Sequence, residues 1–163
     1  MPYTFGKRSS DNLKTCHPDL VKIANLAIQW SPTDFGIHAG ERTIEMQQEY
    51  FRDGKSKINP QDYTETDLME KAKHVVSKDP NSKYALSRAF DFHCSETMPG
   101  KDLTWDITHM AVVIGVIMAA AQYLFDKGEV CYQIRSGGDW DRDGIYIYDH
   151  QFQDLPHIEL INY

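Results

Sequence analysis

The sequence predicts an α+β fold: a single domain, spanning residues 1–163, in which a small antiparallel sheet packs on helices. Three observations predict this class. The chain length suits one hydrophobic core. Two long segments carry apolar residues at helical spacing, and several short apolar runs are bounded by turn residues. The chain also has no internal repeat or linker, so helices and strands are expected to share one core.

The first half of the chain contains three predicted helices. Residues 18–30 are predicted to be helical because a proline suits the first helical position and apolar residues follow at helical spacing. A second helix, capped by Thr43, runs to Arg52. A third, solvated helix is predicted over residues 64–76 because charged side chains lie on its faces. Residues 1–14 are polar, and we expect them to be irregular.

The second half contains one long helix, predicted to begin at Trp105 or Asp106 and to end near Gly128. Its apolar middle, Met110–Ala121, is too short to span a bilayer, so we interpret it as a buried core helix and expect no membrane span. The predicted strands cover residues 35–38, 89–92, 129–134 and 157–161.

The formal net charge is −7 at pH 7, and the basic residues form no stripe. This charge argues against a nucleic-acid binder, and it gives no overall electrostatic attraction to an acidic polymer. The N-terminus lacks the apolar stretch of a secretory signal peptide. We therefore expect a protein made in the cytoplasm, present as a monomer, with no nucleic-acid partner.

Asp154 and His157 form the first candidate site. They stand three residues apart, immediately before an apolar run that predicts the last strand. A histidine that opens a strand, with a carboxylate just before it, can serve as a zinc ligand beside a general base. The alternative is a polar loop that enters an edge strand, because short motifs of this kind occur often without function.

A second candidate site lies in the acidic loop from Asp139 to Gly144. Asp139, Asp141 and Asp143 occupy positions 1, 3 and 5 of a calcium-loop pattern, with the glycine at position 6. Position 12 is His150 rather than the bidentate glutamate of such loops, so any calcium binding should be weak. The alternative is a turn in which the aspartates accept hydrogen bonds from backbone amides.

Four motifs stand out along the chain: Gly40–Thr43, Ser82–Asp91, Gly138–Asp141 and Asp154–Leu160. Taken together, they resemble those of a known family of zinc peptidases. The family comprises the D-Ala-D-Ala carboxypeptidases and the phage L-alanyl-D-glutamate endopeptidases that serve as endolysins. The resemblance covers nearly the whole chain and implies the Hedgehog-like α+β fold of the D-Ala-D-Ala carboxypeptidases.

The resemblance implies a role for each matching residue. Asp91 and His157 match two of the three zinc ligands, and Asp154 matches the general base. Arg42 matches the arginine that holds the substrate and stabilises the oxyanion. Three protein ligands would leave one open position on zinc, where water becomes acidic near neutral pH.

The third ligand departs from the family pattern. In the motif Ser-x-His-x-x-Gly-x-Ala-x-Asp, counting back from Asp91 places the family histidine on Tyr84. A phenol has a pKa near ~10 and ligates well only after it loses its proton. His93 could substitute, because residues i and i+2 of a strand share one face. His74, on the predicted solvated helix, is a weaker candidate.

The sequence therefore leaves three functions open. The protein could keep the peptidase fold with weak or lost zinc-dependent activity. It could be a working peptidase of peptidoglycan stem peptides in which Tyr84 or His93 completes the ligand set. It could instead be a non-catalytic module that binds peptidoglycan or a protein. The resemblance to endolysins implies a protein that stays in the host cytoplasm and reaches the cell wall when the cell is lysed.

Overall fold

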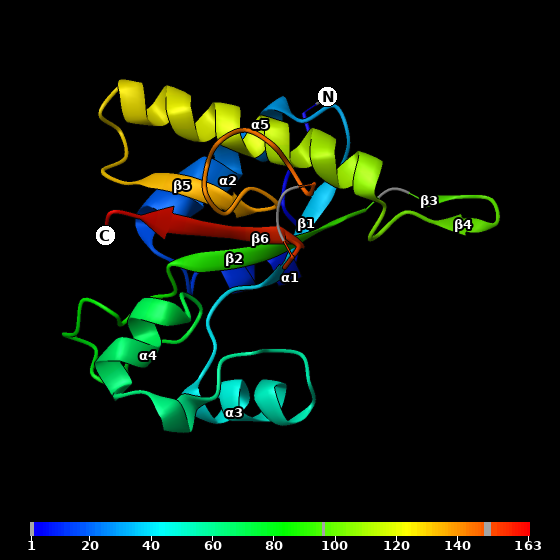
Figure 1. Cartoon of the computed structure of the whole chain (residues 1–163). Helices are drawn as coiled ribbons and strands as arrows, with labels where there is room; N and C mark the ends of the chain where they lie inside the picture. The colour runs from blue at the N-terminus through cyan, green and yellow to red at the C-terminus, as the bar shows by residue number, and fades with distance from the viewer. Residues whose placement is uncertain (1, 96, 149–150) are drawn as a thin grey trace.

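A computed structural model describes the chain apart from residues 1, 96, 149 and 150, and it leaves out the side chain of residue 97. Its centre is an antiparallel sheet of four strands in the order β1-β2-β6-β5 (Figure 1). The short strands β3 and β4 form a separate hairpin. The strand bounds are β1 Phe35–Ala39, β2 Ala89–Cys94, β3 Thr97–Met98, β4 Lys101–Asp102, β5 Gln133–Gly137 and β6 Asp154–Ile161.

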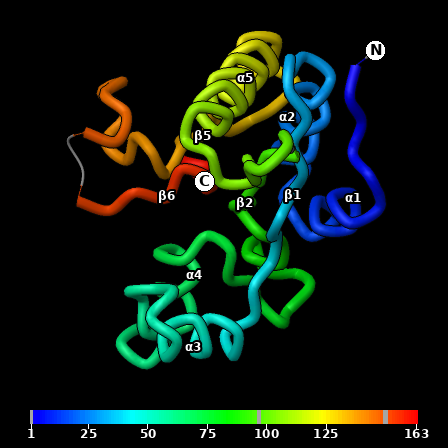
Figure 2. Tube along the Cα trace, turned by 90° about the vertical axis from the view of Figure 1, so that its right-hand side faces the viewer, coloured from blue at the N-terminus to red at the C-terminus, as the bar shows by residue number. Residues whose placement is uncertain are grey.

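Two long helices, α2 (Pro18–Trp30) and α5 (Ile107–Asp126), lie together on one side of the sheet (Figures 1 and 2). Their apolar sides and the strands form the main core, in which Ile23, Ile117 and Phe90 are fully buried. The short helix α1 (Lys7–Leu13) packs beside β1. The predicted α+β class, with an antiparallel sheet packed on helices, is confirmed.

The remaining helices lie away from α2 and α5 and form what we call the α3–α4 lobe, residues 44–72 (Figure 2). It contains α3 (Ile44–Arg52), the 3₁₀ turn η1 (Pro60–Asp62) and α4 (Glu65–Lys71). Thr43 caps α3 through a hydrogen bond from the backbone N–H of Met46, as predicted. A second, smaller apolar core joins this lobe to the segment that follows it.

The third predicted helix is much shorter than expected. It ends at Lys71, and the backbone of residues 74–76 then pairs with Arg42. The Arg42 N–H donates to the carbonyl of His74, and the Val76 N–H donates to the carbonyl of Arg42. These two hydrogen bonds place Val75 in a bridge with Arg42 directly after a turn at residues 73–74, which charge patterning on a helix could not predict.

Three smaller predictions also need correction. Residues 7–13 are helical rather than irregular, with Leu13 buried in the main core. The strand predicted at 129–134 is β5 at 133–137, and the last strand begins at Asp154 rather than at residue 157. In each case tertiary packing or pairing, rather than the local apolar pattern, sets the boundary.

Helix α5 lies where the sequence predicted it, between the N-cap Asp106 and the C-cap Lys127. With 20 residues and a mean hydropathy of 1.8, it is long and apolar enough to cross a membrane by length and composition alone. Buried core helices pass the same test, and α5 packs on α2, β5 and β6. The structure therefore supports the interpretation of α5 as the central core helix.

Candidate metal centre

Three side chains from distant parts of the chain meet beneath the sheet: His74, Asp91 and His157. His74 Nε2 lies 3.1 Å from Asp91 Oδ1 and 3.2 Å from His157 Nδ1. His157 Nδ1 in turn lies 3.1 Å from Asp91 Oδ1. Each residue offers one ligand atom to a common point, and the burial of both histidines excludes most water from it.

The sheet places two of these residues, and the segment that follows the α3–α4 lobe places the third. Asp91 on β2 and His157 on β6 are direct cross-strand partners, so their side chains leave the same face of adjacent strands. His74 reaches the same point from below because its backbone is paired with Arg42.

The outer nitrogen of each histidine has its own partner. Nδ1 of His74 lies 2.6 Å from the carbonyl oxygen of Gly40, and Nε2 of His157 lies 3.0 Å from Glu159 Oε2. A carbonyl and an ionised carboxylate only accept, so both of these nitrogens must carry the hydrogen. The inner nitrogens, His74 Nε2 and His157 Nδ1, then present lone pairs toward Asp91.

Three acceptor atoms therefore converge with no donor among them, which requires a cation at their centre. Burial raises the pKa of Asp91, but the two histidines outweigh burial and hold this pKa well below its usual range. Burial lowers the pKa of His157, but hydrogen bonds with Asp91 and Glu159 raise it to about 10. The cation can be a proton or a metal ion, and two imidazoles with one carboxylate fit a divalent metal ion.

Asp154 and Arg42 line the same groove, which has a volume of about 600 Å³. Asp154 begins β6, and burial raises the pKa of its carboxyl. Gly137 faces it from β5, where a Cβ atom would lie 2.2 Å from the Asp154 carbonyl oxygen. Only glycine therefore allows β5 to approach Asp154 this closely.

The guanidinium of Arg42 is held by its own contacts. Its Nη1 donates to Oε1 of Gln47 at 2.8 Å, and its Cζ lies 4.2 Å from the centre of the Tyr50 ring. Burial lowers the pKa of Arg42, and the nearby Asp91, Tyr50 and Asp154 oppose that effect. Arg42 is thus a fixed cation in the same groove as the three converging acceptors.

Comparisons with known proteins agree with this geometry. A model of the family described as phage L-alanyl-D-glutamate peptidase matches residues 1–161. The chain belongs to this family. The L-alanyl-D-glutamate peptidase of Escherichia phage T5 is 28% identical over 165 residues, which cover 99% of this chain and 100% of that protein.

A solved structure supports the fold of this family member. The L-Ala D-Glu endopeptidase ChiX of Serratia marcescens superposes with a TM-score of 0.61 at 23% sequence identity. The match covers 97% of this chain and 90% of the ChiX chain. The family match bears out the predicted family of phage endolysin-type stem-peptide peptidases, and the likeness to ChiX bears out the fold.

Within this peptidase, Tyr84 lies outside the converging group, and His74 takes the position that counting back from Asp91 assigned to it. The Tyr84 hydroxyl donates to Glu70, and its ring packs in the smaller core. The error has a simple cause: residues 75–86 interrupt the motif, so the histidine stands 17 residues before Asp91. A search that allowed an insertion between the histidine and the rest of the motif would have found His74.

His93 does not join the group either. Its ring packs against Gly36, where a Cβ atom would lie 2.6 Å from the imidazole, and its centroid lies 6.1 Å from that of His38. His93 shares a strand face with Asp91, but this does not bring it to the metal ligands, because His93 pairs with Gly36 of β1 rather than with a residue of β6. The structure brings together four predicted residues, Asp91, His157, Asp154 and Arg42, and adds His74.

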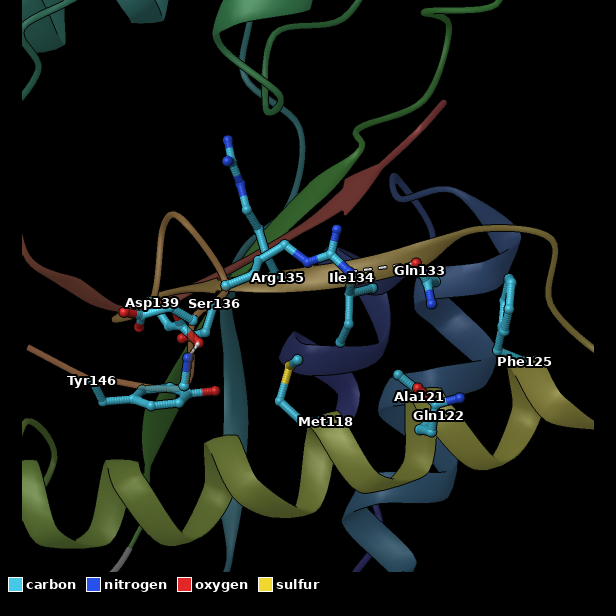
Figure 3. A pocket seen from close by; sticks show the side chains of 13 residues that line it. Met118, Ala121, Gln122, Phe125, Gln133, Ile134, Arg135, Ser136, Asp139 and Tyr146 are labelled. Carbon is cyan, nitrogen blue, oxygen red and sulfur yellow. Dashed lines mark hydrogen bonds between the residues drawn. The ribbon is translucent and has the colours of Figure 1, made fainter.

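The acidic loop of the peptidase lies beside β5 and α5 (Figure 3). Asp139, Asp141 and Asp143 bring ligand oxygens within 4.8 Å of one another. Asp139 is 8% exposed, and its Oδ1 has no hydrogen-bond partner among the described residues. The predicted position 12, His150, lies outside the described residues.

Proposed function

We propose that the chain is a zinc-dependent peptidase that cleaves the bond between L-alanine and D-glutamate in peptidoglycan stem peptides. The observation that carries this proposal is the convergence of three acceptor atoms, from His74, Asp91 and His157, in a groove that also holds Asp154 and Arg42. Family membership supports the choice of bond. Two imidazoles and one carboxylate match the ligand types of catalytic zinc sites.

The chain's own residues have distinct roles in this reaction. When bound, zinc supplies Lewis acidity that polarises the carbonyl and makes water acidic near neutral pH. Asp154, whose pKa is raised by burial, accepts the proton from the attacking water and passes it to the leaving amine. Arg42, fixed by Gln47 and Tyr50, stabilises the negative charge that develops on the carbonyl oxygen.

The alternative of a non-catalytic binding module loses its main support. That interpretation depended on Tyr84 at a ligand position, and His74 stands there instead. Each ligand histidine also has a partner on its outer nitrogen, as working metal sites do.

Zinc content and cleavage of purified peptidoglycan test this proposal together. We expect one zinc ion per chain by metal analysis and release of new amino groups from D-glutamate. Asp154→Asn should keep the zinc and lose cleavage, because the residue is proposed as the base and not as a ligand. Cleavage that continues at the wild-type rate in Asp154→Asn, or in the metal-free protein, would refute the mechanism.

The acidic loop supports a second, weaker cation site, and we propose that it binds calcium. Asp139 Oδ2 accepts from the N–H of Gly144, which has a φ of +88°, while Oδ1 is buried and free for an ion. Because the aspartates follow a calcium-loop pattern, calcium should raise the melting temperature. An unchanged melting temperature in millimolar calcium, equal to that of Asp143→Asn, would exclude the site.

We also propose that the protein is a monomer that remains in the host cytoplasm until lysis, as expected of an endolysin. Sedimentation of the purified chain at a mass above 18.8 kDa would contradict the first part. Recovery of the protein outside intact cells would contradict the second.

A further inference from the structure

The groove that holds the converging acceptors is unusually rich in lysine for an acidic protein. Four of the eleven lysines in the chain line it, although the formal net charge is −7. All four stand on the wall formed by the α3–α4 lobe and the residues next to it, opposite the sheet. They are Lys55, Lys57, Lys71 and Lys73.

Two of these lysines have no carboxylate partner in the part of the chain that the structure describes. Lys73 pairs with Glu70 and Lys55 with Asp53. In contrast, Lys57 has only a cation–π contact, 5.3 Å from the centre of the Phe152 ring, and Lys71 has one with Tyr63 at 5.8 Å. Both are exposed to solvent at the groove, so their charges are available to a ligand.

The carboxylates that line the groove do not neutralise these two lysines. Asp91 lies between the two ligand histidines, and Glu159 pairs with His157 and Arg135. Asp154 interacts with His157 and with Arg42. These three carboxylates thus face cations on the sheet or at Arg42. The positive charges of Lys57 and Lys71, on the opposite wall, are not balanced by them.

Short connections tie Lys57 to the proposed catalytic residues. Gln47 is fully buried and accepts from Arg42 through Oε1. Its Nε2 donates to Ser56 Oγ at 2.8 Å and to the carbonyl of Ile58 at 2.9 Å. One buried side chain therefore fixes both Arg42 and the segment that carries Lys57.

Lys71 is fixed in a similar way at the end of α4. It is the last residue of that helix and stands three residues before His74. The intervening Ala72 is buried in the smaller core, and the backbone of His74 is paired with Arg42. The two unpaired lysines therefore stand at defined positions in the groove.

We propose that Lys57 and Lys71 form an anion subsite that binds the free carboxylate of the glutamate residue in the substrate. This inference rests on the proposed function. A glutamate within a peptide uses one carboxyl in the chain and leaves the other ionised, whichever way it is linked. A lysine ammonium pairs with a carboxylate as a point charge, and two of them on one wall orient the substrate without entering the chemistry.

The test compares substrates and variants in a double-mutant cycle. The substrates are two synthetic stem peptides that differ only in the free glutamate carboxylate, which is either intact or converted to the neutral amide. The variants are Lys57→Gln, Lys71→Gln and both together. Lys127→Gln is the matched control, because Lys127 also lies over an aromatic ring, 4.9 Å from that of Tyr123, but directly after α5 and outside the groove.

We expect KM for the acidic peptide to rise about 2- to 5-fold in each single variant and about 5- to 20-fold in the double variant, with kcat nearly unchanged. The amide peptide should start with the higher KM and respond little to either substitution. Lys127→Gln should match the wild type with both peptides. Equal effects of the lysine substitutions on both peptides would overturn the subsite, because the pairing would not involve that carboxylate.

A binding measurement separates this inference from the proposed function. Calorimetry with the glutamate-first product peptide requires no cleavage. If the wild type cleaves peptidoglycan but binds the acidic and amide products equally, the subsite is wrong and the proposed function stands. If the wild type cleaves nothing yet binds the acidic product more tightly, and Lys57→Gln removes that difference, the subsite stands without the activity.

Discussion

Replacing Glu159 with glutamine should weaken metal binding about 30-fold without touching a ligand. Glu159 is almost buried, with 5% of its side chain exposed, and it accepts on both oxygens. Oε2 faces His157 Nε2 at 3.0 Å, and Oε1 faces Arg135 Nε at 2.8 Å and Nη2 at 2.7 Å. Glutamine offers one acceptor and one donor, so in either orientation its NH₂ group meets another donor.

The magnitude follows from two separate arguments. Loss of a charge-assisted hydrogen bond costs about 1.5–3 kcal/mol. Loss of the partner of a ligand histidine typically weakens metal affinity about 10- to 100-fold, or about 1.4–2.8 kcal/mol. Both ranges centre near ~2 kcal/mol, which corresponds to the expected weakening of metal binding by about 30-fold.

Competition calorimetry with a zinc chelator measures the change directly. Glu70→Gln is the control, since Glu70 also accepts several hydrogen bonds but lies outside the groove. It should leave zinc affinity unchanged. Zinc affinity in Glu159→Gln equal to that of the wild type and the control would show that the carboxylate neither orients His157 nor sets its tautomer.

Three further predictions concern other parts of the site and the lobe. His74→Ala should abolish zinc binding measured by calorimetry, whereas Tyr84→Phe should retain it, because only the histidine reaches the ligand group. Gly137→Ala should cost about 1–3 kcal/mol in urea unfolding and lower kcat, since its Cβ would overlap the Asp154 carbonyl oxygen. Glu70→Gln should be less stable than the wild type mainly above pH 4.5. The hydrogen bond from Tyr84 lowers the pKa of Glu70 from 4.5 to about 2, so its stabilisation is present above pH 4.5 and is lost as the pH falls toward 2.

Each of these predictions has an outcome that would contradict it. Zinc loss in Tyr84→Phe equal to that in His74→Ala would restore the tyrosine as a ligand. Gly115→Ala is the control for Gly137→Ala, because an added Cβ there meets nothing within 4 Å. Equal destabilisation of the two glycine variants would remove the argument from close approach. A stability difference between wild type and Glu70→Gln that stays constant from pH 6 to pH 2 would exclude the linkage.

The sequence predicted most of the fold because its signals were local. The proline and helical spacing of residues 18–30, and the Thr43 cap, reproduce α2 and the start of α3. Asp91 and His157 were also found, since both stand inside recognisable motifs. The residues that sequence reasoning misplaced depend on non-local contacts instead.

His74 is the clearest example of such a residue. Its neighbours in sequence suggest a charged helix, but its carbonyl accepts from the N–H of Arg42, 32 positions earlier, and its backbone turns into the bridge between Val75 and Arg42. The 12 residues between it and Ser87 hide the motif spacing. The overall charge averages over the surface, so it does not report that four of the eleven lysines line one wall of the groove.

An ion held by His74, Asp91 and His157 would also cross-link distant parts of the chain. His74 stands 17 residues from Asp91 and 83 from His157, so an ion shared by them would close two loops at once, as a pair of disulfides does. It would cross-link the segment that follows the α3–α4 lobe to the sheet, in addition to the small core, the pairing at Arg42 and the hydrogen bonds from Arg88 to Met69 and Glu70. A cation bound at this centre therefore cross-links the two walls of the groove. Removal of a bound metal ion by a chelator should expose the lobe to proteases before the sheet unfolds.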